Sequence, residues 1–204
     1  HINQISVRDT IGMSFSAALR SLLRQDPDII MLGEIRDQET ARIAVQASLT
    51  GHLVLSTLHT NDAPSSITRL INIGVEPYLI SASVNAVLAQ RLVRRVCPNC
   101  KEEVHELLEH EKGFMERRNL SVSKMYRGKG CDKCRKTGYR GRMGLYELLV
   151  LDDELRDLIT GSPALGDLRR YAIDHGMVSL QKDGLAKTEA GETTIEEIMR
   201  VTET

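Results

Sequence analysis

Four cysteines, arranged as two Cys-x2-Cys pairs, place the strongest constraint on how this chain can fold. The pairs are Cys97 with Cys100 and Cys131 with Cys134, and the sequence contains no other cysteine. Each pair can present two thiolates on one side of a tight turn, and two facing turns supply the four sulfur ligands of a tetrahedral zinc ion. The sequence therefore predicts a closed, structural zinc site. Reduced structural thiols without a metal are the alternative.

The segment between the two pairs is longer than the usual spacing in a zinc ribbon. Its 30 residues predict an inserted helical excursion rich in charge. Basic residues surround the second pair, which raises a nucleic-acid-binding zinc ribbon or adaptor module as an alternative function. They are Arg127, Lys129, Lys133, Arg135, Lys136, Arg140 and Arg142. Because only Tyr126 and Tyr139 lie nearby and the chain has no Trp, a solvated or partner-facing surface is preferred, with no nucleic acid as partner.

Composition sets wider limits. With 204 residues and 41% hydrophobic side chains, the chain can form one large domain or two modest ones. A formal net charge of −1 gives the whole molecule no field that would draw it onto nucleic acid or an anionic membrane. No apolar run approaches the roughly 18 residues of a membrane span and no signal peptide is visible, so the cytoplasm is the default location.

Helical and strand patterns alternate through the first 96 residues. Apolar runs at 29–32 and within 52–59 predict two buried strands. Three residues are placed to cap the helices around them: Ser14, Asp37 and Asp62. A further helix is predicted from about Pro77 to Arg95. Since strands alternate with helices, we expect an α/β fold with a mostly parallel sheet.

The chain changes character after the cysteine segment. A short strand is expected at 144–151, and helices follow to the end of the chain. They are predicted near 153–160, 164–175, 178–190 and 194–202. Thr194 and Glu197 have the spacing of a capping box at the start of the last helix.

Polar residues stand where both predicted strands end. Glu34 follows the first strand, and Thr57 and His59 lie at the end of the second. Because ligands of open parallel sheets bind at the carboxyl ends of the strands, these side chains could face one pocket, although an ordinary polar loop is the alternative. Arg36 could be a phosphate clamp or a solvated charge.

The position of Glu34 is that of a carboxylate near magnesium and attacking water in nucleotide-hydrolysing α/β folds. Such folds also need a glycine-rich phosphate loop. No G-x-x-x-x-G-K-[ST] motif occurs in these residues.

Residues 23–100 and much of the remaining sequence resemble the ATPases of type II secretion (GspE) and type IV pilus assembly (PilB). "IIMLGEIRD" is similar to the Walker B segment of that family, and "TGHLVLSTLHTNDA" to its histidine box. "CPNC" together with "GCDKCRKTGYRGRMGLYELL" resembles its tetracysteine zinc module. The likeness continues through "DGLAKTEAGETTIEEIMRVT".

The resemblance implies roles for single residues. Glu34 corresponds to the Walker B glutamate, and His52 and His59 to the histidine-box positions near the terminal phosphate. Glu34 and His59 are therefore expected to be catalytic, and Arg36, His52 and Thr57 to bind the nucleotide. Gly33 stands where other phosphate-loop enzymes have an aspartate, so contact with magnesium would run through water.

The resemblance also implies a fold and a division of the chain. We expect a truncated RecA-like parallel sheet with flanking helices over residues 1–96, whose Walker A loop would lie upstream. A tetracysteine zinc module is expected over 97–142 and a C-terminal helical domain over 143–204.

The function implied is that of a type II secretion ATPase, with type IV pilus assembly as the alternative. The full-length protein would be a homo-hexamer that uses ATP, magnesium and structural zinc to drive pseudopilus assembly and protein export. It would be cytoplasmic and would contact the bacterial inner membrane peripherally, through platform proteins.

Overall fold

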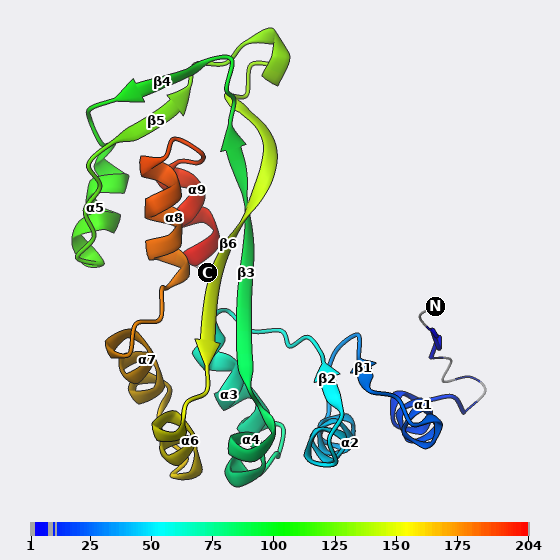
Figure 1. Cartoon of the computed structure of the whole chain (residues 1–204). Helices are drawn as coiled ribbons and strands as arrows, with labels where there is room; N and C mark the ends of the chain where they lie inside the picture. Colours follow the sequence, from blue (N-terminus) through cyan, green and yellow to red (C-terminus); the bar gives the residue numbers. More distant parts are fainter. Residues whose placement is uncertain (1–2, 8–9, 11, 204) are drawn as a thin grey trace. The chain divides into compact units, whose positions relative to one another are not determined.

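The computed structural model describes residues 3–7, 10 and 12–203 and divides into two compact units (Figure 1). Unit 1 comprises the described residues of His1–Val87 together with Val150–Ala172. Unit 2 comprises Leu88–Leu149 and the described residues of Ile173–Thr204. These units cut across the predicted ranges 1–96, 97–142 and 143–204, so that division by sequence character stays a prediction.

The sheet of unit 1 pairs strand β1 (Ile29–Met31) in parallel with strand β2 (Leu53–Leu55). Helices α1 (Phe15–Leu22) and α2 (Gln38–Leu49) precede and connect the two strands, as the helix–strand alternation predicts (Figure 1). Apolar side chains of both helices pack with the strands into one core. Its buried members are Leu19, Ile30, Leu32, Ile43, Ala44 and Ala47. The predicted α/β order and parallel pairing are confirmed.

The prediction of two fully buried strands is wrong. Ile30 is buried, but Ile29 and Met31 are 61% and 77% exposed. Leu53 and Leu55 on β2 are about half exposed as well. Successive side chains of a strand point to opposite faces of the sheet, and the core made with α1 and α2 covers only the face that carries Ile30. The opposite face presents apolar side chains to solvent.

The helices of unit 1 begin at the predicted caps. Ser14, Asp37 and Asp62 each accept a hydrogen bond from a backbone N–H in the first turn of α1, α2 and α3 (Ala63–Asn72), respectively. Helix α4 (Pro77–Ser83) packs against α6 (Asp153–Thr160). Three of their side chains are completely buried: Ile80, Leu155 and Ile159.

The predicted helix from Pro77 to Arg95 is wrong after its second turn. Helix α4 ends at Ser83, and the chain continues as strand β3 (Ala86–Val96), which pairs with β6 (Tyr139–Val150). Exposure along β3 alternates residue by residue as far as Val93. The valines of this segment are β-branched, which favours a strand, and the partner strand lies too far along the sequence to influence a local pattern.

Unit 2 is built on the long ribbon of β3 and β6, which run in opposite directions (Figure 1). Helices α8 (Leu180–Glu189) and α9 (Ile195–Thr202) pack against one face of this ribbon, and α5 (Glu109–Arg117) completes the core. The buried side chains of this core come from all of these elements: Val93, Phe114, Met115, Leu145, Leu180, Leu185, Ile195 and Ile198.

The excursion between the cysteine pairs is only partly helical. Strands β4 (Lys101–Val104) and β5 (Met125–Gly128) form an antiparallel pair on either side of α5. The four predicted C-terminal helices are confirmed as α6, α7 (Leu165–Asp174), α8 and α9. Across the described part of the chain, we find no helix with the length and apolar character that a membrane span needs.

Candidate functional site

The carboxyl ends of β1 and β2 bring four of the five predicted nucleotide-site residues together. Backbone pairing continues past the strands, since Leu32 N–H donates to Leu55 O at 2.8 Å and Ile35 N–H to Thr57 O at 3.0 Å. The hydroxyl of Thr57 donates to the carbonyl of Gly33 at 2.6 Å. Glu34 is therefore held beside the segment that carries His59.

Glu34 is the centre of this cluster. One of its carboxylate oxygens lies 3.0 Å from Nε2 of His59, and the other forms an ion pair with Arg36. The Glu34 side chain is 22% exposed, whereas those of Arg36 and His59 are 74% and 86% exposed. The site is an open edge with a partly covered carboxylate between two solvent-facing bases.

Arg36 stabilises the charged form of that carboxylate. Hydrogen bonding from Arg36 lowers the pKa of Glu34 against the opposing effect of desolvation, and the contact with His59 lowers it further. The same contact raises the pKa of Arg36. Glu34 is thus ionised at neutral pH and is available as a hydrogen-bond acceptor for water.

His52 does not join this cluster. It precedes β2, whereas Thr57 and His59 follow it, so the strand separates the two histidines. The Nδ1 atom of His52 lies 2.9 Å from the carbonyl of Ala47 and 3.2 Å from the hydroxyl of Thr50, at the end of α2. These contacts close the helix end, and a nucleotide-binding role for His52 stays a prediction.

The loop from His59 to α3 is fixed by the predicted cap Asp62 together with contacts that the sequence reading did not predict. The hydroxyls of Thr60 and Ser66 are 2.8 Å apart. Asp62 caps α3 by accepting from Ser65 N–H at 2.8 Å, and its second oxygen accepts from Arg169 of α7. Arg169 follows Asp62 by 107 residues, so no local pattern could have revealed this pair.

The four cysteines form the second candidate site, which lies in unit 2. Their sulfur atoms all lie within 4.8 Å of one another. Cys97 and Cys131 are 3.9 Å apart, as are Cys100 and Cys134. A tetrahedral ion with Zn–S bonds of about 2.3 Å would place its sulfurs about 3.8 Å apart. This donor set fits a metal ion, and within the described residues no histidine or carboxylate belongs to the cluster.

Backbone groups support Cys134 as a thiolate. The N–H groups of Cys131 and Gly138 donate to the sulfur of Cys134 at 3.1 and 3.3 Å. The bond from Cys131 has the larger effect, and together they lower the pKa of Cys134 to about 6 despite desolvation. Desolvation instead raises the pKa of Cys100 to about 12. A bound cation would offset that cost, because thiolates are the form that binds metal.

Two glycines allow the second cysteine turn to approach β5. A Cβ atom on Gly128 would lie 2.1 Å from the carbonyl oxygen of Gly138, and Gly138 itself has φ +77°. The turns are also linked by backbone hydrogen bonds, from Cys97 N–H to Gly138 O at 2.9 Å and from Lys129 N–H to Cys100 O at 3.0 Å. The fold therefore brings the two turns together through main-chain contacts that any side-chain replacement at Gly128 would disturb.

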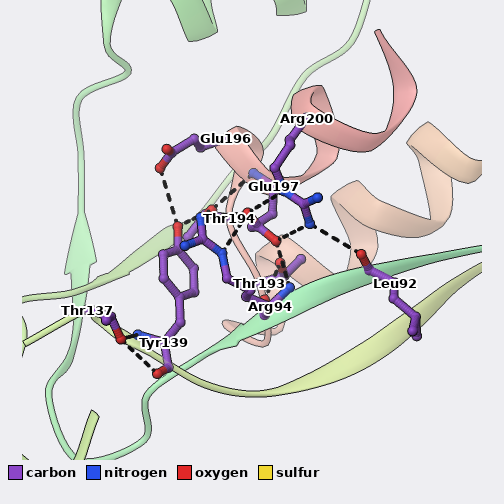
Figure 2. A network of polar contacts seen from close by, with 9 residues as sticks. All are labelled: Leu92, Arg94, Thr137, Tyr139, Thr193, Thr194, Glu196, Glu197 and Arg200. Carbon is purple, nitrogen blue, oxygen red and sulfur yellow. Dashed lines mark hydrogen bonds and ion pairs between the residues drawn. The ribbon is translucent and has the colours of Figure 1, made fainter. Parts of the chain in front are cut away.

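A polar network around the buried Glu197 includes Tyr139, which follows the second cysteine turn (Figure 2). The side chain of Glu197 is completely buried and receives the guanidinium groups of Arg94 and Arg200. The guanidinium of Arg94 also lies 4.0 Å from the centre of the Tyr139 ring, and the Tyr139 hydroxyl is 2.9 Å from that of Thr194. Tyr139 directly follows Gly138 of the second cysteine turn, so this network connects the cysteine cluster to α9.

Much of the basic run around the second cysteine pair is engaged in ion pairs. Three of its seven members pair with carboxylates of unit 2: Arg127 with Glu111, Lys129 with Glu102 and Lys136 with Asp132. Such pairing reduces the positive charge that a phosphate backbone would meet.

Comparison with known proteins gives one matching family model, described as Type II/IV secretion system protein, over residues 1–200. The chain is 53% identical to the type II secretion system protein HxcR of Pseudomonas aeruginosa, over 98% of this chain and 39% of that protein. It is 51% identical to the type IV pilus assembly ATPase PilB of Myxococcus xanthus, over 97% of this chain and 35% of that protein.

The fold is also found among solved structures. The pilus retraction motor PilT with bound ADP matches with a TM-score of 0.65 and 26% identity, over 94% of this chain and 44% of that one. The ATPase DotB of Legionella pneumophila matches with a TM-score of 0.63 at 23% identity, over 93% of this chain and 42% of that one, which is a likeness of fold alone. The chain thus spans well under half the length of these relatives.

Proposed function

The chain belongs to the Type II/IV secretion system protein family, and on that premise we propose that it is the C-terminal part of an ATPase that drives pseudopilus assembly and protein export. The observation that carries the proposal is the contact between Glu34 and His59 at 3.0 Å, at the carboxyl ends of parallel strands. That edge is where α/β sheets bind ligands and where phosphate-transferring folds place their acid.

The residues at this edge have separable roles in the proposed reaction. Glu34, whose charged form is stabilised by Arg36, would orient the attacking water through a hydrogen bond. His59 and Thr57 would contact the phosphate end of the nucleotide, and Arg36 would offer it a planar cation. Magnesium, when bound, would offset charge on the transferred phosphoryl group. Catalysis of this kind depends mainly on positioning, which the hydrogen bonds around Glu34 and Thr57 supply.

We further propose that the four-cysteine cluster holds a structural zinc ion. Four sulfur donors, without a weaker ligand or a position reserved for water, are typical of closed zinc sites that stabilise a fold. Zinc there would supply rigidity to unit 2 rather than chemistry.

The assembly and its location complete the proposal. The full-length protein would act as a cytoplasmic homo-hexamer and would reach the inner membrane through platform proteins. Type IV pilus assembly is the second candidate, because one relative of each kind matches at 51–53% identity. The ion pairs of Arg127, Lys129 and Lys136 disfavour the third candidate, a nucleic-acid-binding module.

The deciding experiment replaces Glu34 with Gln in the chromosomal gene of the source organism. Export of secreted enzymes and surface piliation are then scored in the same strain, with Glu39→Gln, an exposed acid on α2, as the matched control. Lost export with normal piliation supports the secretion role, and the reverse result supports pilus assembly. Normal export and piliation with stable Glu34→Gln protein would contradict both.

A further inference from the structure

Helix α7 is tied to the loop that carries His59 by a single carboxylate. The side chain of Asp62 is 20% exposed, and its two oxygens serve different partners. Oδ1 accepts from the N–H of Ser65 at 2.8 Å, which caps α3. Oδ2 accepts from Nε and a terminal nitrogen of Arg169 at 3.0 and 2.5 Å.

Asp62 lies three residues after His59, at the point where the loop enters α3. The start of α3 is firmly anchored, since Ala63 and Ile67 are completely buried. Arg169 therefore binds an anchored residue, Asp62, three residues beyond His59 and its contact with Glu34.

The ion pair is poorly suited to a purely stabilising role. The Arg169 side chain is 48% exposed, and ion pairs with such exposure contribute little to folding free energy. The two Arg169 nitrogens that donate to one oxygen of Asp62 nevertheless fix the direction of the guanidinium group as well as its distance from the carboxylate. Helix α7 is also the element in which the chain passes from unit 1 to unit 2, so Arg169 stands beside the point where the two units are connected in sequence.

From these contacts we propose that Arg169 is a positioning residue for the His59 loop, and that through Asp62 it makes turnover at the Glu34–His59 site depend on the placement of α7. The inference rests on the proposed ATPase function and adds to it a route by which helix α7 regulates the site. Misplacement of a catalytic group by about 1 Å can cost about 100-fold in rate, so a lost directional contact is expected to act on kcat.

The test compares variants of the full-length protein. Arg169→Ala should lower kcat for ATP hydrolysis about 10- to 100-fold and leave KM within about threefold, with an unchanged unfolding midpoint. Arg169→Lys, which keeps the charge, should recover part of the loss. Asp62→Asn keeps a capping oxygen for α3 and should resemble Arg169→Ala, and the double variant should be no worse than either single one.

Arg170→Ala is the matched control, because Arg170 is the adjacent arginine, 74% exposed, and pairs with Asp167 within its own helix at 3.6 Å. If Arg169→Ala and Arg170→Ala have the same kcat, or if kcat falls only in proportion to unfolded protein, the proposal is overturned.

A second measurement keeps this inference separate from the proposed function. Amide hydrogen exchange in residues 56–66 should be faster in Arg169→Ala than in Arg170→Ala, whether or not ATP is hydrolysed. If the wild-type protein shows no ATPase activity, the proposed function fails and the exchange data still decide the positioning role. Equal exchange in the two variants would reject it.

Discussion

Glu197 of α9 accepts hydrogen bonds from both the backbone and the side chain of Arg94 on β3, 103 residues earlier in the sequence. The backbone N–H of Arg94 lies 2.7 Å from one carboxylate oxygen, and its Nε atom lies 2.9 Å from the other. Arg200 adds a second guanidinium to the same carboxylate (Figure 2). A buried acid is tolerable only because its lone pairs are occupied in this way.

We expect Glu197→Gln to destabilise unit 2 strongly. The Glu197 side chain is completely buried, whereas those of its partners Arg94 and Arg200 are 44% and 51% exposed, so water can solvate the arginines in the variant and we expect a cost of about 1–3 kcal/mol. Glu116→Gln, at an exposed position on α5 of unit 2, is the control and should change stability by less than about 0.5 kcal/mol. Urea unfolding of the three proteins measures both effects, and equal midpoints would show that the network contributes little.

The stabilising effect of Glu197 should depend on pH in a defined direction. Hydrogen bonds from Arg200 and Arg94 outweigh desolvation and lower the pKa of Glu197 from 4.5 to about 2. A lowered pKa gives stability that is present above pH 4.5 and is lost as pH falls toward 2. The size of the pKa shift corresponds to about 3 kcal/mol of unfolding free energy. The difference in unfolding free energy between wild type and Glu197→Gln should shrink over that interval. A difference that stays constant down to pH 2 would contradict the assignment.

These contacts also show which features the sequence could predict. The caps Ser14, Asp37 and Asp62 and the four C-terminal helices follow from local patterns, and all are found in the structure. For Thr194 and Glu197, the expected capping box is only half formed. Thr194 accepts from the N–H of Glu197, but the Glu197 carboxylate turns to the arginines instead.

Long-range pairing marks the limit of sequence reading. From its local sequence, β3 is predicted to be helical. Its strand partner, β6, begins more than 40 residues later, so the local sequence could not reveal the pairing. His52 and His59 share one sequence motif, yet β2 places them at opposite ends of a strand. Glu34, Arg36, Thr57 and His59 could be grouped from the sequence because consecutive parallel strands end at the same edge. No local sequence pattern indicated that Arg94 and Arg169 would pair with distant carboxylates.

We expect one zinc ion per chain, bound by the four cysteines and by none of the six histidines. Metal analysis of protein purified without added zinc should give a molar ratio near one. Cys131→Ser should abolish the metal and loosen residues 97–142 while β1 and β2 of unit 1 stay folded, because metal-binding energy is local folding energy. Hydrogen exchange locates the change. A disulfide between the pairs, or metal retained with His105 or His110 as a ligand, would overturn this prediction.

In the full-length protein, Glu34→Gln should lower ATP turnover by at least about 100-fold and leave ATP affinity largely intact. The amide keeps the shape of the side chain but removes the charge that accepts from Arg36 and His59 and would orient water. Single-turnover kinetics separates the chemical step from binding. Wild-type turnover in the Gln variant would refute the catalytic assignment of Glu34.

The last prediction concerns the 204 residues as an isolated chain, which should neither bind ATP tightly nor hydrolyse it. Triphosphates are held mainly by backbone N–H groups of a glycine-rich loop, by its lysine and by the hydroxyl that holds magnesium. The sequence contains no loop with that spacing. Arg36, the arginine placed in the Glu34 cluster, is already paired with Glu34 itself. Calorimetry with ATP and magnesium should therefore give no measurable heat at micromolar protein, in contrast to the full-length protein under the same conditions. A micromolar Kd for the isolated chain would reveal a phosphate site within these residues. The nucleotide would then bind elsewhere than at the edge formed by β1 and β2, contrary to the proposal.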